Sequence, residues 1–119
     1  LLEILGNDKI VMMTHFPTIA KAFYMQPDPN DPTLTESVDI LFPGVGEVVG
    51  GSMRIYEEDK LIAAFKREGI AMDPFYWYID QRKYGSIPHG GFGLGLERYI
   101  MWLLDLDHVR ETTLYPRFM

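Results

Sequence analysis

The sequence contains no cysteine, so the chain can form neither disulfides nor thiolate metal sites. Basic residues are also few: 11 lysines and arginines stand against 17 acids, which gives a formal net charge of -6. A chain with this balance is not by itself a strong binder of nucleic acid phosphates. Its apolar runs are too short to cross a bilayer, and nothing in it resembles a signal peptide. These absences fit a cytoplasmic setting without proving one. We expect no membrane contact, and any nucleic acid contact would need other surfaces.

The 119 residues are 47% hydrophobic, which is enough for one folded domain at most. The chain begins at Leu1 in what reads as the tail of a helix, and we expect it to be a piece of a longer protein. Alternation and turn residues predict strands over 9–14, 35–42, about 47–56 and 112–115, and helical periodicity predicts helices over 17–22, 57–68, 73–84 and from 96 onward. This order indicates an α+β fold with an antiparallel sheet flanked by helices.

The stretch HGGFGLGLERYIMW, from His89 to Trp102, contains glycine at every second position. Gly91, Gly93 and Gly95 therefore share one face of a predicted strand, while the alternate residues Phe92 and Leu94 are expected to point into a core. Glycine is unfavourable inside a strand unless a ligand or another backbone approaches closely. Two interpretations are open: a flat seat for a nucleotide beside a helix N-terminus and an arginine, or a strand packed tightly under a neighbouring segment.

Charged residues of the preceding hairpin add to this pattern. Asp39 falls on the more polar face of its strand. The Gly50–Gly51 pair is expected to form a bulge or to admit a ligand, and a bulge would let Glu47 and Arg54 converge on one side. If the hairpin pairs with the glycine strand, these three residues share a surface with Arg98. Two carboxylates beside an arginine suit a Mg²⁺–nucleotide site, because the acids are hard oxygen ligands and the cation neutralises phosphate. Taken one at a time, each of these residues has an ordinary surface explanation.

Two other conspicuous motifs have structural explanations. The tetrad FKRE lies at the end of the predicted helix over 57–68, where a charged face exposed to solvent accounts for it. The aromatic run FYWY, at 75–78, is expected to pack in the core rather than to form a stacking platform for a ligand. Neither motif contributes to the predicted site.

The residues resemble those of the class II aminoacyl-tRNA synthetases. GFGLGLERYIM resembles motif 3 of that family, and VDILFPGVGEVVGGSMRI together with FYWYIDQRKYGSIPHGG is similar to its asparaginyl branch in the eukaryotic cytosolic form. The resemblance extends from THFP and KAFYM to LYPRF. It implies that residues 1–119 are the C-terminal half of a catalytic domain, a partial class II core with motif 3 at 91–104. Motif 1, motif 2 and the anticodon-binding domain are not found in these residues.

The resemblance also implies a role for each residue of the predicted site. Arg98 and Glu47 would be catalytic, Asp39 and Glu47 would hold Mg²⁺, and Arg54 would bind the side-chain carbonyl of asparagine. The ATP site would be lined by Glu47, Gly95, Leu96, Glu97 and Arg98, with Arg98 over the adenine and reaching toward the terminal phosphate. His89 either borders the pocket or makes a structural hydrogen bond, and the second is the safer interpretation.

The implied reaction has two steps, in which ATP activates asparagine to asparaginyl-adenylate and the acyl group then passes to tRNA-Asn. The full-length enzyme would be a homodimer, and the isolated fragment is expected to be inactive. Two alternatives remain: an aspartyl-tRNA synthetase of the same class, and a non-catalytic synthetase-like module that binds a nucleotide or a protein partner. The Asp39 to Glu47 spacing favours the asparaginyl branch, because aspartyl relatives usually have one residue fewer there. Gly50 occupies the position where aspartyl relatives often have a serine that assists the metal.

Overall fold

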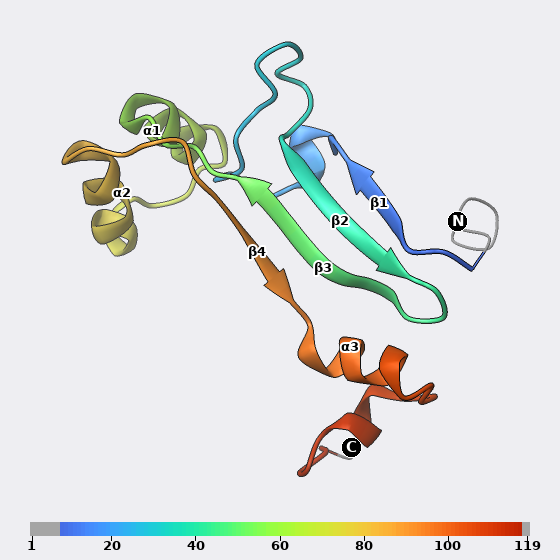
Figure 1. The fold of residues 1–119 in the computed structure, drawn as a ribbon. Helices are drawn as coiled ribbons and strands as arrows, with labels where there is room; N and C mark the ends of the chain where they lie inside the picture. The colour runs from blue at the N-terminus through green and yellow to red at the C-terminus, as the bar shows by residue number, and fades with distance from the viewer. Residues whose placement is uncertain (1–7, 118–119) are drawn as a thin grey trace. The chain divides into compact units, whose positions relative to one another are not determined.

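The computed structural model describes residues 8–117, so the helix expected at the start of the chain lies outside the described residues. Four strands form one sheet in the order β1-β2-β3-β4, and successive strands run in opposite directions (Figure 1). They are β1 (Val11–Thr14), β2 (Ser37–Phe42), β3 (Gly46–Met53) and β4 (Gly90–Leu94). The antiparallel sheet predicted from the sequence is therefore confirmed, and β1, β2 and β3 are each about two residues shorter than expected.

Three α-helices accompany the sheet: α1 (Glu58–Arg67), α2 (Tyr76–Lys83) and α3 (Leu96–Leu103). Short 3-10 helices lie at η2 (Thr18–Ala20), η3 (Asp73–Phe75) and η4 (Val109–Thr112). No helix within residues 8–117 has the length and apolar content that a membrane span needs.

The strand predicted over 112–115 is wrong. Its first residue ends η4, and Leu114 and Tyr115 are 91% and 90% exposed. A strand needs a neighbour for its backbone N–H and C=O groups. No strand within the described residues pairs with this segment, since the sheet ends at β4.

The chain divides into two compact units. Unit 1 comprises the chain up to Met13, Val38–Gly51 and the chain from Phe92 onward, and unit 2 comprises Thr14–Ser37 and Ser52–Gly91. The residues named in the sequence analysis divide between them: Asp39, Glu47 and Arg98 fall in unit 1, and Arg54 falls in unit 2.

The core of unit 2 forms around the amphipathic helix α1. Leu61, Ala64 and Phe65 recur at helical spacing and are buried together with Ile55, which follows β3. Partly buried apolar side chains pack around this cluster: Phe23, Ile70, Met72, Phe75, Tyr78 and Ile79. The charged residues of FKRE are exposed on the opposite side of the helix, as the sequence predicts.

The aromatic run at 75–78 divides between core and surface. Phe75 packs 5.3 Å from Phe65 between ring centroids, and Tyr78 also contacts the core. Tyr76 and Trp77 are 67% and 52% exposed. The expectation that these aromatics pack in the core is correct for only two of the four, because a helix turns successive side chains to different sides.

In unit 1 the helix α3 packs on β2. The ring of Phe42 lies 4.8 Å from that of Trp102 and 6.3 Å from that of Tyr99, both edge to face. The expectation that Phe92 and Leu94 point into a core is wrong, since they are 75% and 46% exposed. A sheet face is buried only when a second layer covers it, and the described residues leave most of Phe92 and nearly half of Leu94 uncovered.

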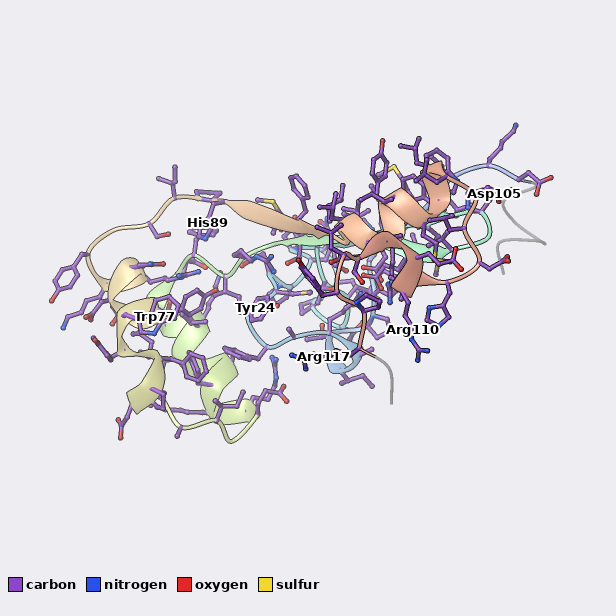
Figure 2. The ribbon with its side chains drawn as sticks, turned by 90° about the horizontal axis from the view of Figure 1, so that it is seen from below. Tyr24, Trp77, His89, Asp105, Arg110 and Arg117 are labelled. Atoms are coloured by element: carbon purple, nitrogen blue, oxygen red, sulfur yellow. The ribbon has the colours of Figure 1, made fainter. Side chains whose placement is uncertain are left out.

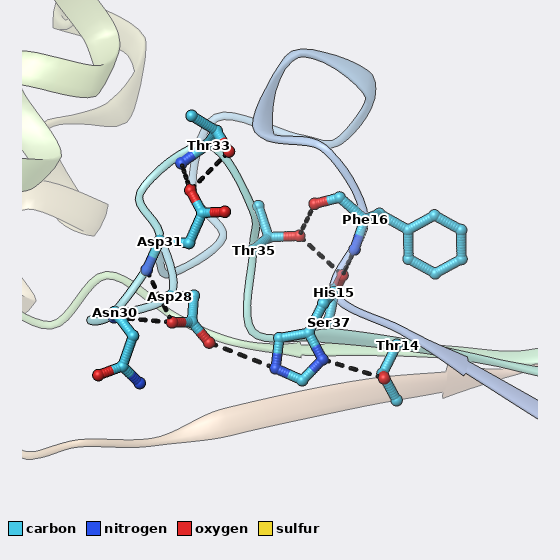
Figure 3. Close-up of polar contacts among 9 residues, drawn as sticks. All are labelled: Thr14, His15, Phe16, Asp28, Asn30, Asp31, Thr33, Thr35 and Ser37. Atoms are coloured by element: carbon cyan, nitrogen blue, oxygen red, sulfur yellow. Dashed lines mark hydrogen bonds and ion pairs between the residues drawn. The ribbon is translucent and has the colours of Figure 1, made fainter.

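The proline-rich loop over 26–33, in unit 2, is held by local polar contacts (Figure 3). Asp28 Oδ1 accepts hydrogen bonds from the backbone N–H groups of Asn30 and Asp31 at 2.7 and 3.1 Å, and Asp28 Oδ2 lies 3.3 Å from His15 Nε2. Asp31 makes the same kind of turn with Thr33. The rigid surface loop predicted from the sequence is therefore built from aspartate turns as well as prolines.

These contacts make the stability of the loop depend on pH. The N–H donors of Asn30 and Asp31 lower the pKa of Asp28 below its ordinary value of 3.8, with a further contribution from the nearby His15. The charge of Asp28 therefore stabilises the folded state above about pH 4, and this contribution is lost as the pH falls through the lowered pKa. Asp28→Asn should melt below the parent protein near neutral pH, and the gap should close as the pH falls through the lowered pKa of Asp28. Thermal melts across this range test it, and a gap that does not depend on pH would contradict the assignment.

Candidate active site

The first part of the site is a pair of carboxylates on the β2–β3 hairpin in unit 1. The connection between the strands is tight because Gly44 and Gly46 adopt φ values of +75° and +92°, which other residues rarely reach. The hairpin places Asp39 and Glu47 on the same side of Gly50. A Cβ atom at Gly50 would lie 2.6 Å from Glu47 Oε1 and 3.6 Å from Asp39 Oδ1. The absent side chain thus leaves the space into which the two carboxylates converge.

Arg98 reaches the same hairpin from α3. The backbone N–H of Gly95 donates to Val48 O at 2.8 Å, which fixes the start of the helix beside β3. One turn later, Arg98 Nη1 donates to Glu47 O at 2.6 Å. The side chain is otherwise exposed, so most of its donors face outward. Unit 1 therefore joins Arg98 to the backbone of the strand that carries Glu47.

The glycines of β4 have different surroundings. A Cβ at Gly93 would meet nothing within 4 Å, so this part of the strand presents open backbone. At Gly90 a Cβ would lie 3.0 Å from both Ser52 O and Met53 Sδ, which is a close approach by the neighbouring strand. Gly90 lies on the opposite face from Gly91, Gly93 and Gly95, so its close contact does not decide between the two interpretations of that face, which stay predictions.

Arg54, in unit 2, has three contacts of its own. Its Nη1 donates to Ser52 Oγ at 2.6 Å and its Nη2 donates to Gly91 O at 3.2 Å. The guanidinium carbon lies 4.9 Å from the centre of the Tyr24 ring. Beside it is a cavity of about 330 Å³ whose other lining side chains are all aromatic, and to which Tyr24 and Trp77 contribute from separate segments (Figure 2).

His89 makes structural contacts in unit 2. Its Nδ1 lies 2.8 Å from Ile87 O and its Nε2 lies 3.4 Å from Arg82 Nη2. Arg82 is 6% exposed and donates through Nε to Ile55 O at 3.1 Å. The backbone oxygen of His89 accepts from the N–H of Arg54 at 2.9 Å. These bonds favour the structural interpretation of His89.

Three residues contribute to this geometry in ways that the sequence does not predict. The sequence predicts that Gly50 forms a bulge or admits a ligand, whereas in the structure it makes room for the side chain of Glu47. Ser52 and Tyr24 were not assigned a role, and only the alternation that places Ser52 on the face of Arg54 could have pointed to the serine. The prediction that Arg54 shares a surface with the three residues of unit 1 stays a prediction.

Comparison with known proteins supplies a family. The family described as tRNA synthetases class II (D, K and N) matches residues 5–119. The cytoplasmic asparagine–tRNA ligases of Bos taurus and Homo sapiens are 59% and 57% identical to the chain over 109 residues. These matches cover 92% of this chain and 20% of each relative. The chain therefore spans about a fifth of the length of the relatives it matches.

Solved structures agree with this match. Asparaginyl-tRNA synthetase of Entamoeba histolytica in complex with asparaginyl-adenylate matches with a TM-score of 0.93 and 58% identity, over 96% of this chain and 26% of that one. A putative aspartyl-tRNA synthetase of Leishmania major matches with a TM-score of 0.87 and 37% identity, over 98% of this chain and 23% of that one. On its fold and on the family match over nearly its whole length, the chain belongs to the class II tRNA synthetases of the D, K and N group.

Proposed function

We propose that the complete protein is a cytoplasmic asparagine–tRNA ligase, which activates asparagine with ATP and transfers it to tRNA-Asn. The observation that carries the proposal is that unit 1 places the carboxylates of Asp39 and Glu47 at Gly50 and bonds Arg98 to the backbone oxygen of Glu47. Relatives named as asparagine–tRNA ligases support the substrate, and identity to the aspartyl structures is lower, at 37% and 32%. The names of these relatives also support the cytoplasmic location.

The acids of unit 1 fit a magnesium ion. Within residues 8–117 no three His, Asp or Glu side chains form a closed metal cage. Mg²⁺ commonly takes one or two carboxylates and completes its shell with water and substrate phosphates, so the pair formed by Asp39 and Glu47 is sufficient. The bound ion would neutralise charge on the ATP phosphates.

The remaining residues position the two substrates. Arg98 would lie over the adenine and extend toward the terminal phosphate, beside an ATP site lined by Gly95, Leu96 and Glu97. Arg54 would donate to the side-chain carbonyl of asparagine. The carboxylate of asparagine would attack the α-phosphorus of ATP and release pyrophosphate, and catalysis would rest on positioning and charge neutralisation.

Residues 1–119 would then form the C-terminal half of the catalytic domain, with motif 3 at 91–104. Motifs 1 and 2, the anticodon-binding domain and the homodimer interface would belong to the rest of the protein. The net charge of -6 supports this division, because the tRNA backbone needs basic surfaces that this part does not supply.

The proposal is tested by comparing asparagine with aspartate as the amino acid that the protein activates. In the complete protein, pyrophosphate exchange should be faster with asparagine than with aspartate by about 10²-fold or more, because a polar pocket rejects a substrate that leaves its groups unpaired. Equal or faster exchange with aspartate would establish the aspartyl alternative. Absence of exchange with either amino acid, combined with ATP binding measured by calorimetry, would indicate a non-catalytic module.

A further inference from the structure

Arg54 is a half-buried cation that is held by neutral groups. Its side chain contacts a hydroxyl, a backbone carbonyl and an aromatic face. A guanidinium held by neutral groups keeps its full charge for a ligand.

Each neutral contact is held in place by its own surroundings. Ser52 is 7% exposed and lies two residues before Arg54, on the same face of the chain. Tyr24 is fixed by backbone pairing on both sides: Ile55 N donates to Tyr24 O at 3.0 Å, and Gln26 N donates to Met53 O at 2.9 Å. The ring of Phe23 also meets that of Tyr24 edge to face at 5.4 Å. The supports of Arg54 are therefore more rigid than an exposed side chain.

These supports fix the direction of the guanidinium. The guanidinium carbon lies over the Tyr24 ring, while Ser52 and Gly91 each occupy one donor, on Nη1 and on Nη2. A Cβ at Gly91 would lie 3.4 Å from Nη2 and 3.7 Å from Nε, so glycine lets the arginine lie close to the strand. Three of the five N–H donors stay available, in an orientation that the protein has already set.

We propose that Tyr24 and Ser52 are positioning residues that orient Arg54 for the side-chain carbonyl of the amino acid substrate. This inference rests on the proposed function and deepens it. A preoriented guanidinium loses little side-chain entropy when the ligand binds, and affinity for the amino acid is gained without a direct contact from Tyr24 or Ser52. Loss of either support should weaken binding of the amino acid and leave binding of ATP unchanged.

The test uses Ser52→Ala and Tyr24→Leu in the complete protein, with Tyr24→Phe as the conservative variant. Ser52→Ala and Tyr24→Leu should each raise the KM for asparagine by about tenfold, with no comparable change in the KM for ATP. Tyr24→Phe should leave the KM for asparagine at the parental value, because it keeps the aromatic face. The matched control is Tyr84→Leu, which removes a tyrosine that is 78% exposed in the same unit. An unchanged KM for asparagine, or an equal rise in the KM for ATP, would overturn the inference.

A second measurement does not depend on activity. The Nε–H group of Arg54 gives a side-chain NMR signal whose relaxation reports its order on the ps–ns timescale. Order should fall in Ser52→Ala and in Tyr24→Leu but not in Tyr24→Phe. Unchanged order in both disruptive variants refutes the positioning role. If the parent protein shows no asparagine-dependent exchange, the proposed function fails while this measurement still decides whether the two residues hold Arg54.

Discussion

Replacing Arg98 with alanine in the complete protein is expected to abolish measurable asparagine-dependent pyrophosphate exchange. The guanidinium is anchored to Glu47 O at 2.6 Å, so its charge is held at the backbone of β3 before ATP arrives. Removing one such preorganised donor costs on the order of 10²–10³-fold in rate, and the substitution also removes a full positive charge. The exchange assay with saturating asparagine and varied ATP measures the loss.

The matched control is Arg67→Ala on α1. Arg67 is an exposed arginine that pairs with its neighbour Glu68 at 2.8 Å, and surface pairs of this kind contribute little to stability. Exchange in this variant should remain at the parental level. Near-normal exchange in Arg98→Ala would remove Arg98 from the proposed mechanism, whatever the function of the protein.

Replacing Glu47 with glutamine is expected to lower the exchange rate by about 10²-fold at ordinary magnesium concentrations and to raise the magnesium concentration needed for half the maximal rate. The amide keeps the size of the side chain but loses the charge that would hold the ion. Calorimetric titration with Mg²⁺ and ATP should show weaker binding. Asp59→Asn on α1 is the control, because it removes an exposed carboxylate far from Glu47 in the sequence.

Gly50→Ala provides an independent check on the same carboxylate. Its new methyl group would stand 2.6 Å from Glu47 Oε1, so the carboxylate must move away from its place beside Asp39. Gly50→Ala should therefore also raise the magnesium concentration needed for half the maximal rate. The rise should be smaller than in Glu47→Gln, because the charge of Glu47 is kept. If neither variant changes the magnesium dependence, the carboxylate pair is not the metal site.

The periodic spacing of apolar residues along the chain predicted most of the helices and strands. The spacing of Leu61, Ala64 and Phe65 indicated both the helix α1 and its buried face. Residues three and four positions apart lie on one side of a helix, so the pattern that predicts the helix also marks its apolar side. The prediction failed for the segment at 112–115, whose composition suits a strand. Strand formation depends on a partner that may lie anywhere in the chain, and composition carries no information about that partner.

Local sequence patterns also could not predict which side chains of a strand are buried. Phe92 and Leu94 alternate as core residues should, yet both are exposed within this chain. Alternation shows which side chains share a face, whereas burial depends on a second layer that other residues must supply. Since the chain spans about a fifth of its relatives, that layer need not be among these residues.

The sequence by itself determined the family, the antiparallel hairpin and the residue types of the site, because turn glycines, alternation and motif spacing are local properties of the chain. Only the tertiary structure showed that Gly50 leaves room for two carboxylates, that Arg98 reaches the backbone of Glu47 and that Tyr24 supports Arg54. Each of these facts joins residues far apart in the sequence or depends on side-chain direction. Such contacts are fixed by how the strands and helices pack in space, and no local pattern contains them.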